Sequence, residues 1–271
     1  MTRYAFDFLP APEGRTSAKP RAAGLTMTID SGVPLGRAAD MLELAGPYVD
    51  IAKIKTGGSR LYPRDYLKRK IALYREHGLD VFPGGQFLEY VIHTSRQDAV
   101  PRYWEEALAL GFTAIEVSDN VVPLTDERRH ALISGAVAAG LKVFGEVGSK
   151  ENETDLETLA RQAEISFDAG ASLVLVEAAE LISADGVNHE LLAGIRERLD
   201  MSRVLIELPG PWISNVSHHM IDDMAKLLVR ALGPDVNLGN VAFDTLFDLE
   251  TTRSGLGVAG PPGAGKQAMK G

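Results

Sequence analysis

The stretch from Leu141 to Glu177 decides the fold, because it holds one complete unit of a pattern that recurs along the chain. It begins with the apolar segment LKVFGEV (Leu141–Val147), continues through LETLARQAEISFDA (Leu156–Ala169) and ends with the apolar segment SLVLVE (Ser172–Glu177). The middle stretch has the residue spacing of an amphipathic helix. Near-continuous apolar segments are typical of parallel strands buried on both faces. This unit therefore predicts a strand, a covering helix and a parallel strand.

The same unit repeats over the whole chain. Eight apolar segments start 24 to 34 residues apart, at Gly24–Asp30, Tyr48–Ile54, Leu79–Pro83, Thr113–Ser118, Leu141–Val147, Ser172–Glu177, Arg203–Leu208 and Val236–Val241. Five glycines stand where predicted helices end, at Gly78, Gly111, Gly140, Gly170 and Gly233. Glycine readily adopts the left-handed conformation that terminates a helix. Eight strand–helix units in 271 residues predict an α/β fold, a single (β/α)₈ TIM barrel, rather than a doubly wound sheet.

No linker or shift in composition divides the chain, so we predict one catalytic barrel domain over residues 1–255. Residues 1–20 form an N-terminal extension that either covers the bottom of the barrel or is loose. Residues 256–271 have little to bury and are predicted to be a flexible tail. The tail contains GPPGAGK (Gly260–Lys266), which imitates a phosphate-binding loop. Gln267 stands where Ser or Thr is needed and no strand precedes the motif, so we reject that interpretation.

The composition excludes several classes of function. Lys and Arg number 28 against 37 Asp and Glu, a formal net charge of −9, which disfavours nucleic acid and anionic membranes as partners. The absence of cysteine excludes disulfides, zinc–thiolate sites, iron–sulfur clusters and thiol catalysis. Met1–Pro20 lacks a secretory signal, and no apolar run approaches the roughly 20 residues that span a bilayer. We expect a soluble, cytoplasmic protein.

Polar residues end or follow most of the predicted strands. In strand order they are Asp30, Lys53, Lys55, Glu89, Glu116, Ser118, Asp119, Glu146, Lys150, Glu177, Glu207, Asn237 and Asn240. The active sites of such barrels lie at these carboxyl ends, and buried charge is costly unless it is paired or bound to a metal. We therefore expect small anionic substrates held by lysines, and a divalent cation held by carboxylates. Oxygen ligands suit Mg²⁺.

The predicted metal ligands are Glu116, Asp119, Glu146 and Glu177. Strand tilt decides which of these carboxylates, or Glu207, point inward, so the set stays open.

Two glycine-rich loops follow the second and third strands. They read KTGGS (Lys55–Ser59) and PGG (Pro83–Gly85). Glycine allows backbone N–H groups to approach a phosphate or carboxylate closely. We therefore expect Lys55, Gly58, Ser59, Gly84 and Gly85 to bind substrate.

Several segments together resemble the phosphosulfolactate synthase family. In family order they are Lys19–Asp30, Tyr48–Lys53, Phe82–Gly85 with Glu89, Gly111–Asp119, Glu146–Lys150, Asn237–Asn240 and Leu249–Thr251. The resemblance implies a barrel enzyme, a carbon–sulfur lyase-type synthase that adds sulfite to phosphoenolpyruvate with Mg²⁺ assistance, early in coenzyme M biosynthesis. It also implies a homo-oligomer such as a trimer.

Residue roles follow from the resemblance. Lys150 matches the family's proposed general acid, and Asp30 and Lys53 match positions at the barrel mouth that we assign to catalysis. Ser118 and Asn240 likewise match mouth positions and are assigned to substrate binding.

The chain departs from the family pattern where the family carries arginines. After the sixth strand the family has Glu-x-Arg-Glu-Ser-Gly and this chain has EAAELI (Glu177–Ile182). Near the end, Arg-Arg-Gly-Leu-Arg-Gly-Asp is replaced by RSGLGVA (Arg253–Ala259). Arginine forks are not replaceable by small residues. The chain resembles a divergent member, and three functions stay open: phosphosulfolactate synthase, an enzyme that adds a different nucleophile to phosphoenolpyruvate or a related phospho-acid, and a non-catalytic barrel of the heat-stress-associated type.

Overall fold

The eight apolar segments form eight parallel strands. They are β1 (Thr26–Asp30), β2 (Ile51–Ile54), β3 (Asp80–Pro83), β4 (Ala114–Val117), β5 (Lys142–Val147), β6 (Leu173–Glu177), β9 (Val204–Glu207) and β10 (Leu238–Ala242). The computed structural model describes residues 4–6, 8–9, 14–16, 18–94, 99–148, 155–183, 186–211, 216–258 and 260.

The strands pair in the order β3-β2-β1-β10-β9-β6-β5-β4, and every ladder in this sheet is parallel. The two edges meet beside β3 and β4. The N–H of Thr113 donates to the carbonyl of Val81 at 3.0 Å, and the N–H of Val81 donates to Thr113 Oγ1 at 2.9 Å. These bonds bring the ends of the sheet together, so the predicted (β/α)₈ barrel is confirmed.

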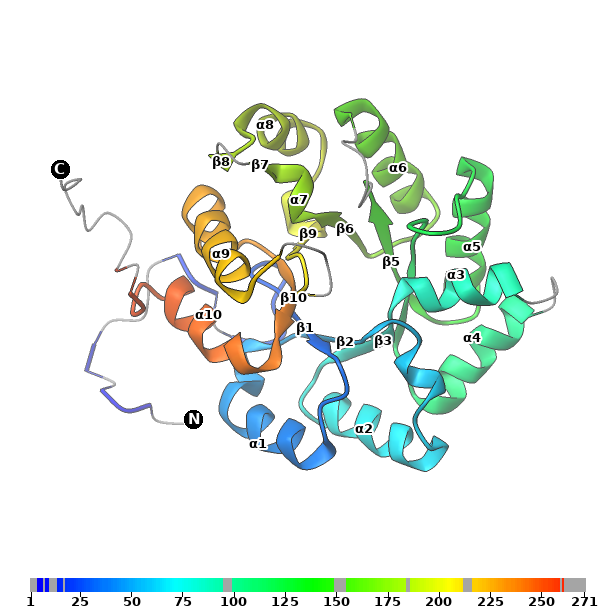
Figure 1. The fold of residues 1–271 in the computed structure, drawn as a ribbon, viewed down its shortest axis with the longest axis horizontal. Helices are drawn as coiled ribbons and strands as arrows, with labels where there is room; N and C mark the ends of the chain where they lie inside the picture. The colour runs from blue at the N-terminus through cyan, green and yellow to red at the C-terminus, as the bar shows by residue number, and fades with distance from the viewer. Residues whose placement is uncertain are drawn as a thin grey trace.

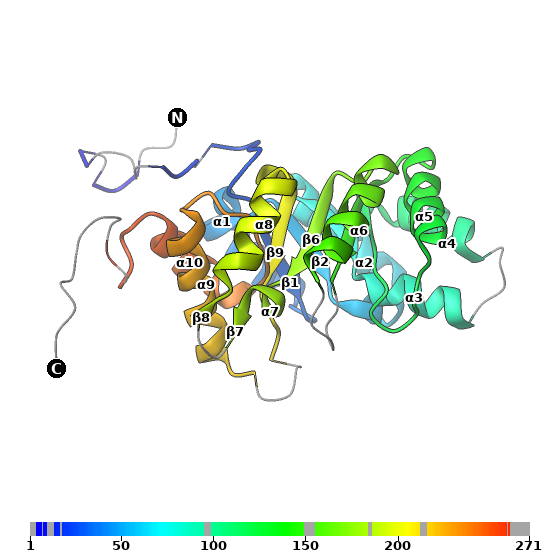
Figure 2. The same ribbon diagram turned by 90° about the horizontal axis from the view of Figure 1, so that it is seen from above.

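Helices surround the strands (Figure 1). They are α1 (Leu35–Ala45), α2 (Arg64–Glu76), α3 (Gly85–Thr94), α4 (Ala99–Leu110), α5 (Asp126–Ala138), α6 (Leu156–Asp168), α7 (Ala178–Leu181), α8 (His189–Arg198), α9 (His218–Leu232) and α10 (Leu246–Arg253). The five glycines predicted to end helices all have positive φ, between 74° and 101°. One strand–helix unit contains extra short elements. Between β6 and α8 lie the helix α7 and an antiparallel hairpin formed by β7 (Ile182–Ser183) and β8 (Gly186–Val187). They lie along the lower edge of Figure 2.

Two apolar layers form the core. The outer layer packs the strands against the helices. The inner layer fills the barrel with Met27, Ile51, Phe82, Ala114, Phe144, Leu173, Leu175 and Leu205. Successive side chains of a strand point to opposite faces, so residues two positions apart share a face. The next inward residues on β2, β4, β5, β6 and β9 are therefore charged. They are Lys53, Glu116, Glu146, Glu177 and Glu207.

The N-terminal extension contacts the bottom of the barrel. The guanidinium of Arg15 lies 2.8 Å from Glu250 and 3.3 Å from Asp235, which precedes β10. The ammonium of Lys19 donates to the carbonyl of His77, before β3, at 3.1 Å. Arg15 and Lys19 thus pack against the bottom of the barrel, whereas the large apolar side chains earlier in the extension are exposed, namely Tyr4, Phe6, Phe8 and Leu9.

The domain bounds remain predictions. Much of the predicted tail, residues 259 and 261–271, lies outside the described residues. None of the described helices combines the length and the apolar character needed to cross a membrane.

The barrel interior gives a test of its packing. A Cβ added to Gly239 would lie 2.4 Å from Leu205 Cδ2 and 2.5 Å from Met27 Cε. Overpacking a core costs about 1–3 kcal/mol. Gly239→Ala should lower the free energy of unfolding by that amount in urea titrations. Gly36→Ala is the matched control, because nothing lies within 4 Å of its Cβ. Equal stability of the Gly239→Ala variant and wild type would contradict the packed interior.

Candidate active site

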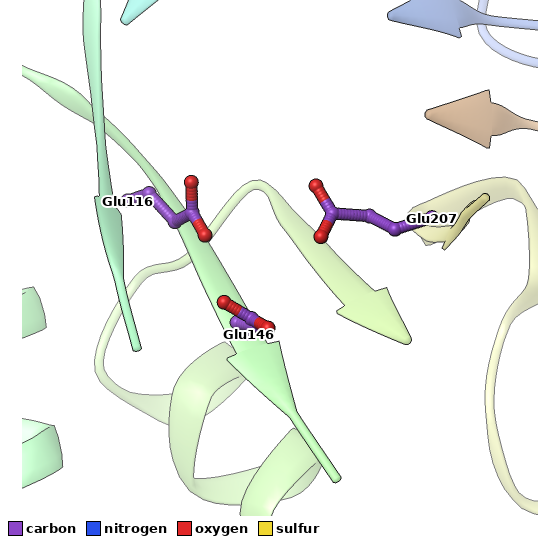
Figure 3. A group of neighbouring side chains, drawn as sticks. All are labelled: Glu116, Glu146 and Glu207. Carbon is purple, nitrogen blue, oxygen red and sulfur yellow. The ribbon is translucent and has the colours of Figure 1, made fainter. Parts of the chain in front are cut away.

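Four charged side chains meet inside the barrel above the apolar layer. They are Lys53 on β2, Glu116 on β4, Glu146 on β5 and Glu207 on β9, and none is more than 7% exposed. The three carboxylates, called the carboxylate cluster below, each offer an oxygen within 4.8 Å of the others. Figure 3 shows them converging from three separate strands. The strand alternation thus concentrates charge where burial makes it costly.

Lys53 joins two members of the carboxylate cluster. Its ammonium lies 2.8 Å from Glu207 Oε1 and 3.0 Å from Glu116 Oε2. Burial by itself would lower the pKa of Lys53, but the charges of Glu116, Glu207 and Glu146 raise it well above its ordinary value. Lys53 therefore stays cationic throughout the neutral range.

One ammonium does not neutralise three carboxylates. With all four groups ionised the net charge is −2, since three negative charges meet one positive charge. Burial raises the pKa of Glu116 well above its ordinary value, and Glu146 and Glu207 raise it further while Lys53 opposes them. The protonated form of Glu116 is therefore favoured more strongly in the folded protein than in water. A divalent cation would balance the net charge of −2 and favour the ionised form of Glu116.

The donor set fits a divalent cation. Glu207 Oε2 and Asn240 Oδ1 are buried and accept no hydrogen bond from the described part of the chain. The amide of Asn240 is oriented because its Nδ2 donates to the carbonyl of Leu208 at 3.2 Å, which leaves Oδ1 as the open acceptor. Carboxylate and amide oxygens are the ligands of hard cations.

A small polar pocket of about 30 Å³ adjoins the carboxylate cluster. It is lined by Ile29, Lys53, Lys55, Thr56, Gly84, Gly85, Gln86, Glu116, Asn120, Glu146 and Asn240. Burial lowers the pKa of Lys55. The pocket also adjoins the first residue of α3, where the helix dipole favours negative charge. The two lysines and the helix end favour an anion here, whereas Glu116 and Glu146, which line the same pocket, suit a cation.

Close backbone packing shapes the pocket. A Cβ on Gly84 would lie 2.7 Å from the backbone nitrogen of Thr56, and one on Gly85 would lie 2.9 Å from Glu116 Oε1. Thr56 and Asn240 have φ of 43° and 56°. Such conformations are strained for residues other than glycine and concentrate at functional sites. Three of these four residues belong to the loops after β2 and β3 that were predicted to approach an anion.

Comparison with known proteins decides the family. The model of the (2R)-phospho-3-sulfolactate synthase family matches residues 14–258. The chain belongs to the phosphosulfolactate synthase family. The phosphosulfolactate synthase of Methanothermobacter thermautotrophicus is 36% identical over 264 residues, which cover 93% of this chain and 95% of the relative. That of Methanocaldococcus jannaschii is 32% identical over 244 residues, covering 86% and 92%.

A solved structure supports the fold alone. The carboxyl transferase domain of Rhizobium etli pyruvate carboxylase with 3-hydroxypyruvate matches with a TM-score of 0.55 at 17% identity, covering 82% of this chain and 40% of that chain. The predicted membership of the phosphosulfolactate synthase family and the predicted barrel thus agree with independent comparisons.

Asp30 lies beside this family member's pocket but faces away from it. Its Oδ1 accepts the N–H groups of Gly32 and Val33 at 2.9 and 2.8 Å. Its Oδ2 accepts the hydroxyl of Tyr74 at 2.6 Å and lies 2.5 Å from the ammonium of Lys70. The carboxylate therefore fixes the loop between β1 and α1, and the structure does not bring it to the carboxylate cluster.

Two of the predicted metal ligands also lie outside the carboxylate cluster. Asp119 is 2.8 Å from the guanidinium of Arg129. Burial raises the pKa of Asp119, although Arg129 acts in the opposite direction. Glu177 is buried at the end of β6 in register with Glu207, and the group of three does not include it.

The remaining predicted residues divide into three groups. Lys55, Gly84, Gly85 and Asn240 line the pocket. Gly58 and Ser59 lie in the 3₁₀ turn Thr56–Arg60, and the hydroxyl of Ser118 donates to Glu89. Lys150 lies outside the described residues.

Sequence reasoning left one contributor undecided and missed another. Glu207 was not chosen as a ligand, although alternation from Leu205 places it inward as firmly as Glu116 and Glu146. Asn120 donates to Glu146 Oε2 at 2.9 Å, and no local pattern marks it because it lies in an irregular loop.

The raised pKa of Glu116 predicts a pH dependence of stability. In the unfolded chain Glu116 loses its proton near its ordinary pKa, whereas the buried group retains it, so unfolding releases a proton above about pH 4.5. Without divalent cations, wild type should lose stability relative to Glu116→Gln as the pH rises from 5 to 8. Urea titrations in EDTA measure the difference, and parallel pH profiles would contradict it.

Proposed function

We propose that the protein is a phosphosulfolactate synthase that adds sulfite to the methylene carbon of phosphoenolpyruvate. The observation that carries the proposal is the carboxylate cluster around Lys53, directly beside an anion-favouring pocket. A carboxylate cluster suits a divalent cation, and the pocket suits a small anion. Family membership supports the synthase activity, and the resemblance implies sulfite and phosphoenolpyruvate as its substrates.

The reaction balances without any further reactant. The sulfur of sulfite forms a bond to the methylene carbon, the electron pair of the carbon–carbon double bond moves toward the substrate carboxylate, and a proton is added to the adjacent carbon. The phosphate stays attached. The main barrier is the negative charge that accumulates as two anions combine, and electrostatic stabilisation is the usual remedy.

The carboxylate cluster would hold the cation, which we propose to be Mg²⁺. When bound, the ion would neutralise charge that develops on the substrate carboxylate. Lys53 contributes a permanent positive charge beside it. Because the pKa of Lys53 is raised well above its ordinary value, Lys53 is unsuited to donate the proton. We assign it to binding and charge stabilisation.

The other end of the substrate would lie over Lys55 and the start of α3. Lys55, Gly84 and Gly85 line that side of the pocket, and helix N-termini bind phosphate well. Lys150, the general acid that the resemblance implies, remains the proposed donor to the adjacent carbon.

A second candidate keeps phosphoenolpyruvate or a related phospho-acid and changes the nucleophile. Among the described residues that line the pocket, the cations are Lys53 and Lys55, and none is an arginine. This agrees with the loss of arginines from the family pattern and favours a less highly charged nucleophile. The resemblance further leads us to propose a cytoplasmic homo-oligomer whose product enters coenzyme M biosynthesis.

Product analysis tests the function. With phosphoenolpyruvate, sulfite and Mg²⁺, mass spectrometry should detect phosphosulfolactate, and Lys53→Met should lower kcat/KM by about a hundredfold or more. Lys142→Met is the matched control, because this lysine pairs with Asp80 away from the pocket. Absence of product would exclude sulfite addition. Thermal stabilisation by phosphoenolpyruvate in the same sample would then favour the second candidate.

The proton donor needs its own test. Lys150→Ala should abolish turnover, because no other assigned group supplies the proton, yet it should leave the binding of phosphoenolpyruvate within about threefold of wild type. Isothermal titration calorimetry measures the binding and mass spectrometry the turnover. Retention of most of the turnover would show that the acid is another group.

A further inference from the structure

Glu89 in α3 is buried and holds the loop between β4 and α5. Its Oε1 accepts the hydroxyl of Ser118 and the N–H of Asn120 at 3.2 Å. Its Oε2 accepts the N–H groups of Val121 and Val122 at 2.6 and 2.8 Å. Each carboxylate oxygen thus accepts two donors, which is the full capacity of the group.

These bonds determine the path of the loop. Residues 118–122 contain no helix or strand, so their backbone groups lack the partners that regular structure would provide. Three successive N–H groups point at one carboxylate instead. The conformation of this loop therefore depends on Glu89 more than on any contact within the loop.

The loop in turn presents a side chain to the carboxylate cluster. Asn120, whose backbone is held by Glu89, donates its Nδ2 to Glu146 Oε2 at 2.9 Å. A carboxylate that is oriented by a hydrogen bond on one oxygen has its other oxygen directed as well. Groups that orient metal ligands in this way commonly change metal affinity by about 10- to 100-fold.

We propose that Glu89 is a positioning residue that orients Glu146 through Asn120. The proposal rests on the proposed role of the carboxylate cluster as a cation site. Glu89 touches no member of that cluster in the contacts described above, and its effect passes through the loop.

Arg129 also anchors this loop, but its contacts do not replace those of Glu89. Arg129 pairs with Asp119 at 2.8 Å and donates to the backbone carbonyl of Glu146 at 2.6 Å. These contacts involve the main chain of Glu146 and the side chain of Asp119, and neither of them reaches the carboxylate of Glu146. Asn120, in contrast, donates directly to the carboxylate of Glu146.

Glutamate is the required residue at position 89. Glutamine has one acceptor oxygen, so Glu89→Gln would turn an NH₂ group toward two of the four donors. Aspartate is shorter by one methylene and would not reach the loop. The substitution Glu89→Gln keeps the size of the side chain and removes only its accepting capacity.

A double-mutant cycle on the whole chain tests the route. Mn²⁺ affinity, measured by electron paramagnetic resonance without substrate, should fall about tenfold in Glu89→Gln and by a similar factor in Asn120→Ala. The double variant should bind Mn²⁺ as well as Asn120→Ala alone, because both changes break the same link. Effects that multiply, or wild-type affinity in Glu89→Gln, would overturn the proposal.

A matched control separates positioning from general destabilisation. Glu250→Gln also removes a buried carboxylate, one that pairs with Arg15 at the bottom of the barrel, and should leave Mn²⁺ affinity unchanged. A loss of affinity in this variant equal to that in Glu89→Gln would assign both effects to stability, against the proposal.

Hydrogen exchange provides a readout that needs no metal. The side-chain amide protons of Asn120 should exchange slowly in wild type and at least tenfold faster in Glu89→Gln. If wild type binds no Mn²⁺, the proposed cation site is wrong. The hydrogen-exchange rates then test the role of Glu89 in the loop by themselves. Equal exchange rates in the two proteins would overturn it.

Discussion

The ion pairing of Lys53 with Glu116 and Glu207 inside a closed barrel is the interaction on which the rest of the site depends. Charge is expensive in an interior, and the ammonium of Lys53 by itself balances the charge of one of the three carboxylates. Burial, together with the charges of Glu146 and Glu207, raises the pKa of Glu116, and the carboxylates hold Lys53 cationic. A divalent cation would balance the negative charge that remains. The inner layer below the carboxylate cluster is apolar, so it supplies no charge that could balance the carboxylates from that side.

Two roles can be distinguished among the acidic residues near the strand ends. Glu116, Glu146 and Glu207 point into the barrel and form the carboxylate cluster. Asp30 and Glu89 hold loops, since each accepts several hydrogen bonds from the backbone that follows a strand. The same residue type therefore supplies both the reactive interior and the scaffold around it.

Much of the fold could be predicted because its signals are local. Apolar segments, helical spacing and terminating glycines each depend on a few neighbouring residues, and all five glycines adopt the expected conformation. The inward direction of Glu207 was also within reach, since alternation from Leu205 determines it.

The rest of the site depends on contacts between distant segments. Glu89 meets the loop at 118–122 only after α3 and β4 are in place, and nothing in either segment encodes the distance between them. The engagement of Asp30 by Lys70 and Tyr74 likewise depends on how α2 packs against β1. Such pairings follow from tertiary packing, which single-chain patterns do not specify.

The anomalous scattering of Mn²⁺ in crystals grown with phosphoenolpyruvate measures this arrangement most directly. The charge balance of the carboxylate cluster predicts a peak bonded to oxygens of Glu116, Glu146 and Glu207, with the substrate beside Lys53. If the carboxylate cluster kept its present contacts at saturating Mn²⁺ and the anomalous peak lay elsewhere or was absent, the proposed cation site would be wrong.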